Sequence, residues 1–331
     1  MTRKVLCSLY AASCVEDGGI YIYSFSKDGE LKYRGKLPLD RPMYMASAGK
    51  CLYTVLRQPF PDKPDSAIVA LDILPDGKLA KNSGPRSTQG GIACHLLVDG
   101  DDMYLTNYIS GSVVKMPDTL VVHKGKGVHP QRQTSPHTHQ AVFSPDKRFV
   151  CVTDLGLDKI FVYDRGLALR SEASVPAGHG ARHMVFSPDG NFAFCANELA
   201  STVSSFFWNS GVLEHLGTVD ALPGKDKSQT TSAAIRLSPD GNYLYTSNRG
   251  DDSISCFRVC GGEPRLFDIV NCEGRTPRDF IFSPDGKYLI CANEDSDNLS
   301  IFEVVEGQLF LLNSNPSIRK PVCVLFWEKM E

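Results

Sequence analysis

The chain has 331 residues, of which 42% are hydrophobic, and its formal net charge at pH 7 is −3. A chain of this length can bury a large core, and its nearly balanced charge shows no bias toward nucleic acid or an acidic membrane surface. No segment approaches the roughly 18 consecutive apolar residues of a membrane helix. We therefore expect a soluble globular protein.

Eleven cysteines are scattered along the chain without CxxC pairs or a regular framework. Cys151, Cys195 and Cys291 lie inside apolar runs, where a free thiol packs as a small hydrophobic group. A chain of this size needs no disulfide staples, so the cysteine usage favours reduced thiols and a cytoplasmic location.

The first segments in chain order predict β-strands. Lys4–Ser13 loosely resembles a signal peptide, but its apolar run is short and is broken by Ser8, so we expect it to be a strand followed by another over Gly18–Ser26. Arg41–Arg57 and Ile92–Met116 each contain an apolar run, a turn with glycine and a further strand. These segments are weak copies of a pattern that becomes clear downstream.

Four strong copies of that pattern follow, each built around a Ser-Pro-Asp turn. The turns begin at Ser144, Ser187, Ser238 and Ser283, so successive copies are 43, 51 and 45 residues apart. Proline at the second position and glycine at the fourth fit a type I turn between two strands, and a third strand follows in every copy. This period is typical of the blades of a β-propeller.

The last apolar run, Lys320–Trp327, predicts an inner strand with nothing after it, whereas the N-terminal strands have no inner strand before them. Joining the two ends completes a seventh blade. The sequence therefore predicts an all-β, seven-bladed propeller that forms one domain over residues 1–331, with its ring closed by strands from both termini.

Two repeat positions carry charged side chains. Five residues before the turn serine lie His139, Arg182, Ala233 and Arg278, and eleven residues after it lie Leu155, Glu198, Arg249 and Glu294. A hairpin brings the start of one strand beside the end of the next, so both positions should reach the same mouth of the channel. Such residues can bind an anion and transfer protons, or they can merely pair across neighbouring blades.

His137 and His139 form a His-X-His pattern, which is a weak metal signal because no third ligand stands nearby. We expect His139 to share the mouth with Arg182 and Arg278, whereas His137 is a candidate substrate-binding or supporting residue, with an ordinary loop residue as the alternative. No nucleotide-binding, nucleophile-elbow or metalloprotease motif is present in the sequence. We therefore expect no metal and no cofactor.

The segments around His139, Arg182, Glu198 and Arg278 resemble the seven-bladed lactonase family, which includes propeller-type 6-phosphogluconolactonases and carboxy-muconate lactonising enzymes. The resemblance covers nearly the whole chain. It implies a catalytic group of His139, Arg182, Glu198 and Arg278, and Arg249, Glu294 and His137 are candidate substrate-binding residues.

The expected partner is a small anionic or sugar-lactone substrate, not nucleic acid or a membrane. Hydrolysis of a sugar lactone is the favoured reaction, and a muconate-type cycloisomerase would need the same residue types. A non-enzymatic propeller that binds a ligand or protein is the alternative from a different class. The sequence leaves the substrate and the oligomeric state open.

Overall fold

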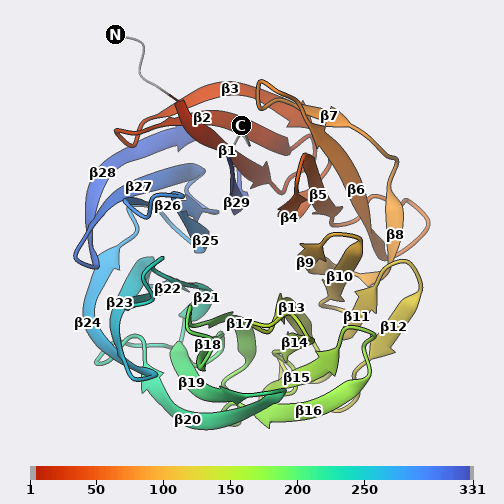
Figure 1. The fold of residues 1–331 in the computed structure, drawn as a ribbon, viewed down its shortest axis with the longest axis vertical. Helices are drawn as coiled ribbons and strands as arrows, with labels where there is room; N and C mark the ends of the chain where they lie inside the picture. The colour runs from red at the N-terminus through yellow and green to blue at the C-terminus, as the bar shows by residue number, and fades with distance from the viewer. Residues whose placement is uncertain (1–4, 329–331) are drawn as a thin grey trace.

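The computed structural model describes residues 5–328, and all the regular elements in that range are β-strands. Seven antiparallel sheets stand side by side around a central axis, and the first and last strands of the chain lie next to each other (Figure 1). The fold is a seven-bladed β-propeller, which confirms the repeat-based prediction. Within the described residues, no helix has the length and apolar character needed to cross a bilayer.

Each blade starts with an inner strand at the axis, and we name the blade after that strand. The β4 blade contains β4 (Pro42–Ala48), β5 (Cys51–Leu56), β6 (Asp65–Ile73) and β7 (Leu79–Lys81), with β8 (Arg86–Gly91) also paired to β6. The β9 blade contains β9 (Ala93–Asp99), β10 (Asp102–Asn107), β11 (Ser112–Lys115) and β12 (Thr119–Val122). The β13 blade contains β13 (Thr138–Phe143), β14 (Phe149–Asp154), β15 (Lys159–Asp164) and β16 (Leu169–Ser174).

The remaining blades follow the same order from the axis outward. The β17 blade contains β17 (Ala181–Phe186), β18 (Phe192–Asn197), β19 (Thr202–Asn209) and β20 (Val212–Asp220). The β21 blade contains β21 (Thr231–Leu237), β22 (Tyr243–Arg249), β23 (Ser253–Cys260) and β24 (Glu263–Asn271). The β25 blade contains β25 (Pro277–Phe282), β26 (Tyr288–Asn293), β27 (Asn298–Val305) and β28 (Gln308–Ser317). The β29 blade contains β29 (Pro321–Trp327), β1 (Val5–Ser13), β2 (Gly19–Ser26) and β3 (Leu31–Pro38).

The Ser-Pro-Asp turns join the inner strand to the second strand in four blades. In each turn the serine hydroxyl accepts a hydrogen bond from the amide five residues later, at 2.9 to 3.0 Å. The fourth residue has a left-handed backbone, with φ near +71 to +75° at Gly190, Gly241 and Gly286 and +55° at Lys147. Glycine adopts this conformation without strain, which explains why it recurs at the fourth position.

The core lies between blades. One buried cluster joins Phe194 and Val203 of the β17 blade to Ile235, Leu244 and Phe257 of the β21 blade. Each such side chain contributes about 1.5 to 3 kcal/mol when it leaves water. A single blade would expose these faces, so the ring is stable only as a whole.

The ring is closed by the pairing of β29 with β1, in which Leu9 lies opposite Phe326 and Ala11 lies opposite Val324. The blade that contains both ends also packs onto its neighbour, because Ala11 and Val324 share a cluster with Ile290 and Leu299 of the β25 blade. The contact between these blades therefore depends on a strand from the far end of the chain.

Removal of the last ten residues, by ending the chain at Pro321, should open the ring. The variant would lose β29 and expose the apolar faces that this strand covers, so we expect the midpoint of thermal unfolding to fall by more than about 10 °C. Circular dichroism during heating measures the midpoint. A truncated chain that unfolds cooperatively at the temperature of the full chain would show that closure is dispensable.

Candidate functional site

A cavity of about 340 Å³ lies at the N-terminal ends of the inner strands. Its lining residues come from the β4, β9, β13, β17, β21 and β25 blades and from the segment that precedes β13. They are Met43, Arg57, Ile92, Cys94, Tyr108, Ile109, Arg132, His139, Glu198, Arg249 and Arg278. The first and last of these residues in the chain, Met43 and Arg278, are 235 positions apart.

The two charged repeat positions meet in this cavity. Of the seven candidate site residues, four line it, namely His139, Glu198, Arg249 and Arg278. The hairpin places the second residue of an inner strand close to the residue at or just after the end of the second strand, so both positions approach this end of the axis.

Glu198 is the centre of the charged group. Its Oε2 atom lies 2.9 Å from Nε of Arg182 and 2.9 Å from Nη2 of Arg249, and its Oε1 atom pairs with Arg132. The backbone of Glu198 is fixed as well, because its amide donates to Gly180 at 2.7 Å and its carbonyl accepts from Ser232 at 3.1 Å. One buried carboxylate thus holds three guanidinium groups from three parts of the chain.

These contacts shift the pKa values of the partners. Burial acts to raise the pKa of Glu198, but the positive charges of Arg249 and Arg182 outweigh it and hold that pKa far below its usual range. Burial and the charge of Arg249 lower the pKa of Arg182 to about 9. Glu198 is therefore ionised at neutral pH, and its low basicity makes it a poor proton acceptor.

His139 has the opposite electrostatic environment. Burial of its ring, together with the charge of Arg182, lowers its pKa well below the ordinary value, so the imidazole is neutral near pH 7. Its carbonyl accepts hydrogen bonds from Cys94 Sγ at 3.2 Å and from Thr106 Oγ1 at 3.0 Å, which fixes the start of β13. A neutral, rigidly held imidazole at a cavity wall can accept a proton from a ligand or from water.

Arg182 does not line the main cavity. It lies behind Glu198 and lines a space of about 10 Å³ that shares His139 and Arg278 with the main cavity. His183 lies beside it, with its Nδ1 atom 3.3 Å from Nη1 of Arg182 and its ring 5.0 Å from that of His139. The sequence predicts Arg182 at the mouth, but Arg182 instead lies behind the cavity lining, where its guanidinium group pairs with Glu198.

His137 and Glu294 also lie outside the cavity lining, and each contacts a residue that forms it. The ring of His137 stacks on Tyr108 at 4.4 Å, and its Nδ1 atom is 2.9 Å from the carbonyl oxygen of Tyr108. Glu294 lies 3.0 Å from Nη1 of Arg278. Both residues support the wall of the cavity from behind.

Seven of the eleven lining residues were not predicted as site residues, and three of those seven are Arg57, Tyr108 and Arg132. Arg57 directly follows β5 and Tyr108 directly follows β10, so both occupy the repeat position of Glu198 in the weaker blades. Extending the alignment to those blades would have found them. Arg132 stands outside the repeat, in the connection between β12 and β13, and only its contact with Glu198 reveals its role.

The connection that carries Arg132 is anchored by the buried side chain of Gln133. Its Nε2 atom donates to the Leu155 carbonyl at 2.9 Å and to Asp158 Oδ1 at 2.7 Å. Asp158 in turn accepts hydrogen bonds from the amides of Gly178 and Gly180 at 2.7 and 2.6 Å. This network ties the connection to the β13 blade and to the segment before β17.

Other reactive groups near the cavity have a different character. Burial raises the pKa of Cys94 to about 11, so its thiol stays protonated and is a poor nucleophile. Over residues 5–328, the structure contains no group of three or more His, Cys, Asp or Glu side chains placed to hold a metal ion.

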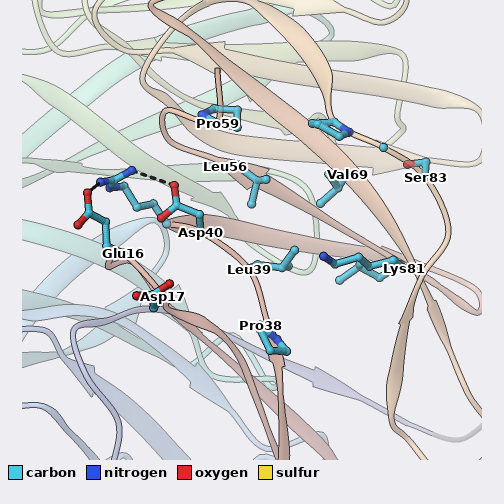
Figure 2. A pocket seen from close by; sticks show the side chains of 14 residues that line it. Glu16, Asp17, Pro38, Leu39, Asp40, Leu56, Pro59, Val69, Lys81 and Ser83 are labelled. Carbon is cyan, nitrogen blue, oxygen red and sulfur yellow. Dashed lines mark hydrogen bonds and ion pairs between the residues drawn. The ribbon is translucent and has the colours of Figure 1, made fainter. Parts of the chain in front are cut away.

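A larger cavity of about 830 Å³ lies between the β29 blade and the β4 blade (Figure 2). Its walls include Leu39, Leu56 and Val69, and its main charged groups pair with one another, since Arg41 contacts Asp40 at 2.8 Å and also Glu16. It contains no buried carboxylate or imidazole, so the smaller axial cavity is the better candidate for chemistry.

Comparisons with known proteins identify the family to which this fold belongs. Residues 8–326 match the family model described as lactonase, 7-bladed beta-propeller. A 6-phosphogluconolactonase of Bacillus subtilis is 32% identical, over 96% of this chain and 97% of that protein. A crystal structure of a putative 6-phosphogluconolactonase from Bacteroides fragilis has a TM-score of 0.90 at 29% identity and covers 99% of both chains.

The periplasmic gluconolactonase of Pseudomonas aeruginosa has a TM-score of 0.88 at 29% identity and covers 97% of this chain and 99% of its own. The family model and the Bacillus relative both extend over nearly the entire chain. The chain therefore belongs to the seven-bladed β-propeller lactonase family.

Proposed function

We propose that the protein hydrolyses a sugar lactone that carries an anionic group, and that the reaction takes place in the axial cavity. The observation that carries the proposal is the pairing of a neutral imidazole, His139, with a carboxylate, Glu198, that arranges three arginines. The names of the Bacillus, Bacteroides and Pseudomonas relatives support a lactone as substrate.

His139 acts as the general base in this proposal. Its imidazole removes a proton from water, and the water oxygen attacks the lactone carbonyl carbon to form a tetrahedral intermediate. The bond between that carbon and the ring oxygen then breaks, and the imidazolium returns the proton to the leaving oxygen. The product is the open-chain hydroxy acid. Glu198 is too weakly basic for this task, because nearby arginines lower its pKa.

Arg249 and Arg278 are the proposed donors to the oxyanion, since both line the cavity beside His139. One well-placed donor contributes about 3 kcal/mol to transition-state stabilisation. Arg182 acts indirectly, because its guanidinium holds Glu198 from behind.

The charge of the cavity indicates how the substrate is oriented. Four arginines line it, namely Arg57, Arg132, Arg249 and Arg278, against the single carboxylate of Glu198. A phosphate or carboxylate group on the substrate can bind the arginines that do not serve the oxyanion, because a guanidinium group matches these anions in a two-point contact. Glu294 and His137 support this group of residues from outside the cavity.

Two further parts of the proposal concern the chain as a whole. We propose that the chain is a single domain, because the closing blade takes strands from both ends of residues 5–328. The cytoplasm is the proposed location, since all eleven cysteines are free and ten of them are at least partly buried.

Replacing Glu198 with glutamine should lower both activity and stability. The variant leaves the guanidinium of Arg182 buried without its counter-charge, which costs about 3 to 5 kcal/mol for a broken buried ion pair. Chemical denaturation measures the loss. Glu294→Gln is the control, because the side chain of Glu294 is more exposed and pairs with Arg278, so we expect a loss below about 1 kcal/mol. Equal losses in both variants would remove Glu198 from its central role.

Replacing His139 with asparagine tests the general base. Asparagine is polar and compact but cannot accept a proton near neutral pH, so we expect kcat to fall by about 10² to 10⁴. The hydrolysis of glucono-1,5-lactone 6-phosphate, followed by acid release, measures the rate. A folded variant that retains more than about a tenth of the wild-type kcat would contradict the assignment.

The pH profile should lack the inflection that an ordinary histidine produces. The pKa of His139 lies well below 6.5 because burial and Arg182 disfavour the imidazolium, so the neutral base persists as the pH falls through 6.5 and is lost only at the lowered pKa. We expect kcat/KM to stay constant from about pH 7.5 to about pH 5.5 after correction for uncatalysed hydrolysis. A twofold or larger decline centred at 6.5 would contradict this prediction.

A further inference from the structure

Most of the charged residues of the axial cavity come from different blades than its aliphatic residues. Its buried carboxylate, its imidazole and two of its arginines come from four consecutive blades, β13 to β25, whereas its aliphatic residues Met43, Ile92 and Ile109 come from the β4 and β9 blades. Figure 1 places β4 and β9 across the ring from β17 and β21. Arg57 is the charged residue on the aliphatic side. A ligand on the axis therefore meets charge on one side and hydrocarbon on the other.

Ile92 is the unusual member of the aliphatic side. Its backbone is left-handed, with φ at +53°, and a β-branched side chain is strained in that conformation. Two glycines, Gly90 and Gly91, precede it directly and have no positive φ. The strained position in this segment is therefore occupied by an isoleucine, although glycine would adopt it freely.

The fold itself imposes this backbone conformation. The residue just before the inner strand is left-handed in five of the seven blades, at Arg41, Ile92, Gly180, Thr276 and Lys320. Hydrogen bonds hold the segment around Ile92, whose carbonyl accepts from the amide of Tyr108 at 2.9 Å. On either side of it, the Gly91 and Ala93 amides each donate to a serine hydroxyl at 2.8 Å.

The residue type at this position is not imposed by the fold, since the β17 blade uses Gly180. Three of the other side chains make polar contacts, because Arg41 pairs with Asp40, and both Thr276 and Lys320 contact Asp295. Isoleucine has no polar group for such a contact, and Ile92 is one of the residues that line the axial cavity. A strained backbone position in the wall of a cavity is a candidate for a role in ligand binding.

We propose that Ile92 determines specificity, and that with Met43 and Ile109 it receives the hydrocarbon face of the lactone ring. The inference rests on the proposed function and deepens it. The favoured substrate class is a compact lactone whose anionic group extends to one side, toward the arginines, while carbon-bound hydrogens of the ring face Ile92. Removal of the isoleucine side chain should weaken substrate binding without weakening the fold, since the strain is relieved at the same time.

The test compares Ile92→Gly and Ile92→Val with the wild type, using glucono-1,5-lactone and its 6-phosphate as substrates. For Ile92→Gly we expect KM to rise about tenfold for both lactones, kcat to stay within about threefold, and the unfolding midpoint to stay equal or rise by about 2 °C. Ile92→Val retains most of the side chain, so its KM should stay within about threefold of the wild type.

Lys320→Gly is the matched control, because it relieves the same backbone conformation before β29 and its side chain does not line the cavity. Its KM should equal that of the wild type. The assignment would be overturned if the KM of Ile92→Gly stayed within about twofold of the wild type, because Ile92 would then make no contribution to binding. It would also be overturned if the unfolding midpoint fell by more than about 5 °C, because Ile92 would then have a structural role. A wild-type protein that hydrolyses neither lactone would contradict the proposed function instead, and the unfolding comparison would still test the strain.

Discussion

The pairing of β29 with β1 is the constraint on which the rest of the structure depends. It fixes the number of blades and closes the ring, so every inner strand is held at the axis by two neighbours. Equivalent positions of different blades then lie around one opening. This is why a histidine at position 139 and an arginine at position 278 line one cavity although almost 140 residues separate them. Local structure alone would leave these side chains unrelated.

Glu198 and His139 would both titrate below pH 7 in water, but their surroundings in the ring give them different roles. Glu198 is surrounded by guanidinium groups, so it remains charged and serves to arrange them. His139 is buried beside positive charge, so it remains neutral and keeps a free proton-accepting capacity. The same cluster of arginines thus lowers the pKa of both groups, which leaves Glu198 as a permanent anion and His139 as an uncharged base of reduced strength.

The ring also explains how asymmetry arises from a repeat. All blades offer the same backbone positions to the opening, including a left-handed residue before most inner strands. The β4 and β9 blades contribute the aliphatic lining residues together with Arg57, whereas the β13 to β25 blades contribute His139, Glu198, Arg249 and Arg278. A symmetric frame with an asymmetric lining can orient a small ligand that has one charged end, and Ile92 belongs to this lining although its left-handed backbone disfavours a β-branched residue.

The sequence by itself determined the strands, the turns, the number of blades and the two positions that approach the axis, because these follow from local patterns that recur at a regular spacing. It therefore predicted one mouth for His139, Arg182, Glu198, Arg249, Arg278 and Glu294, and four of these six residues line the axial cavity. Only the tertiary structure decided that Arg182 lies behind Glu198 and that Arg132 reaches the same carboxylate. A repeat fixes which backbone positions approach the axis. How deeply a side chain is buried and where a connection runs depend on packing between blades.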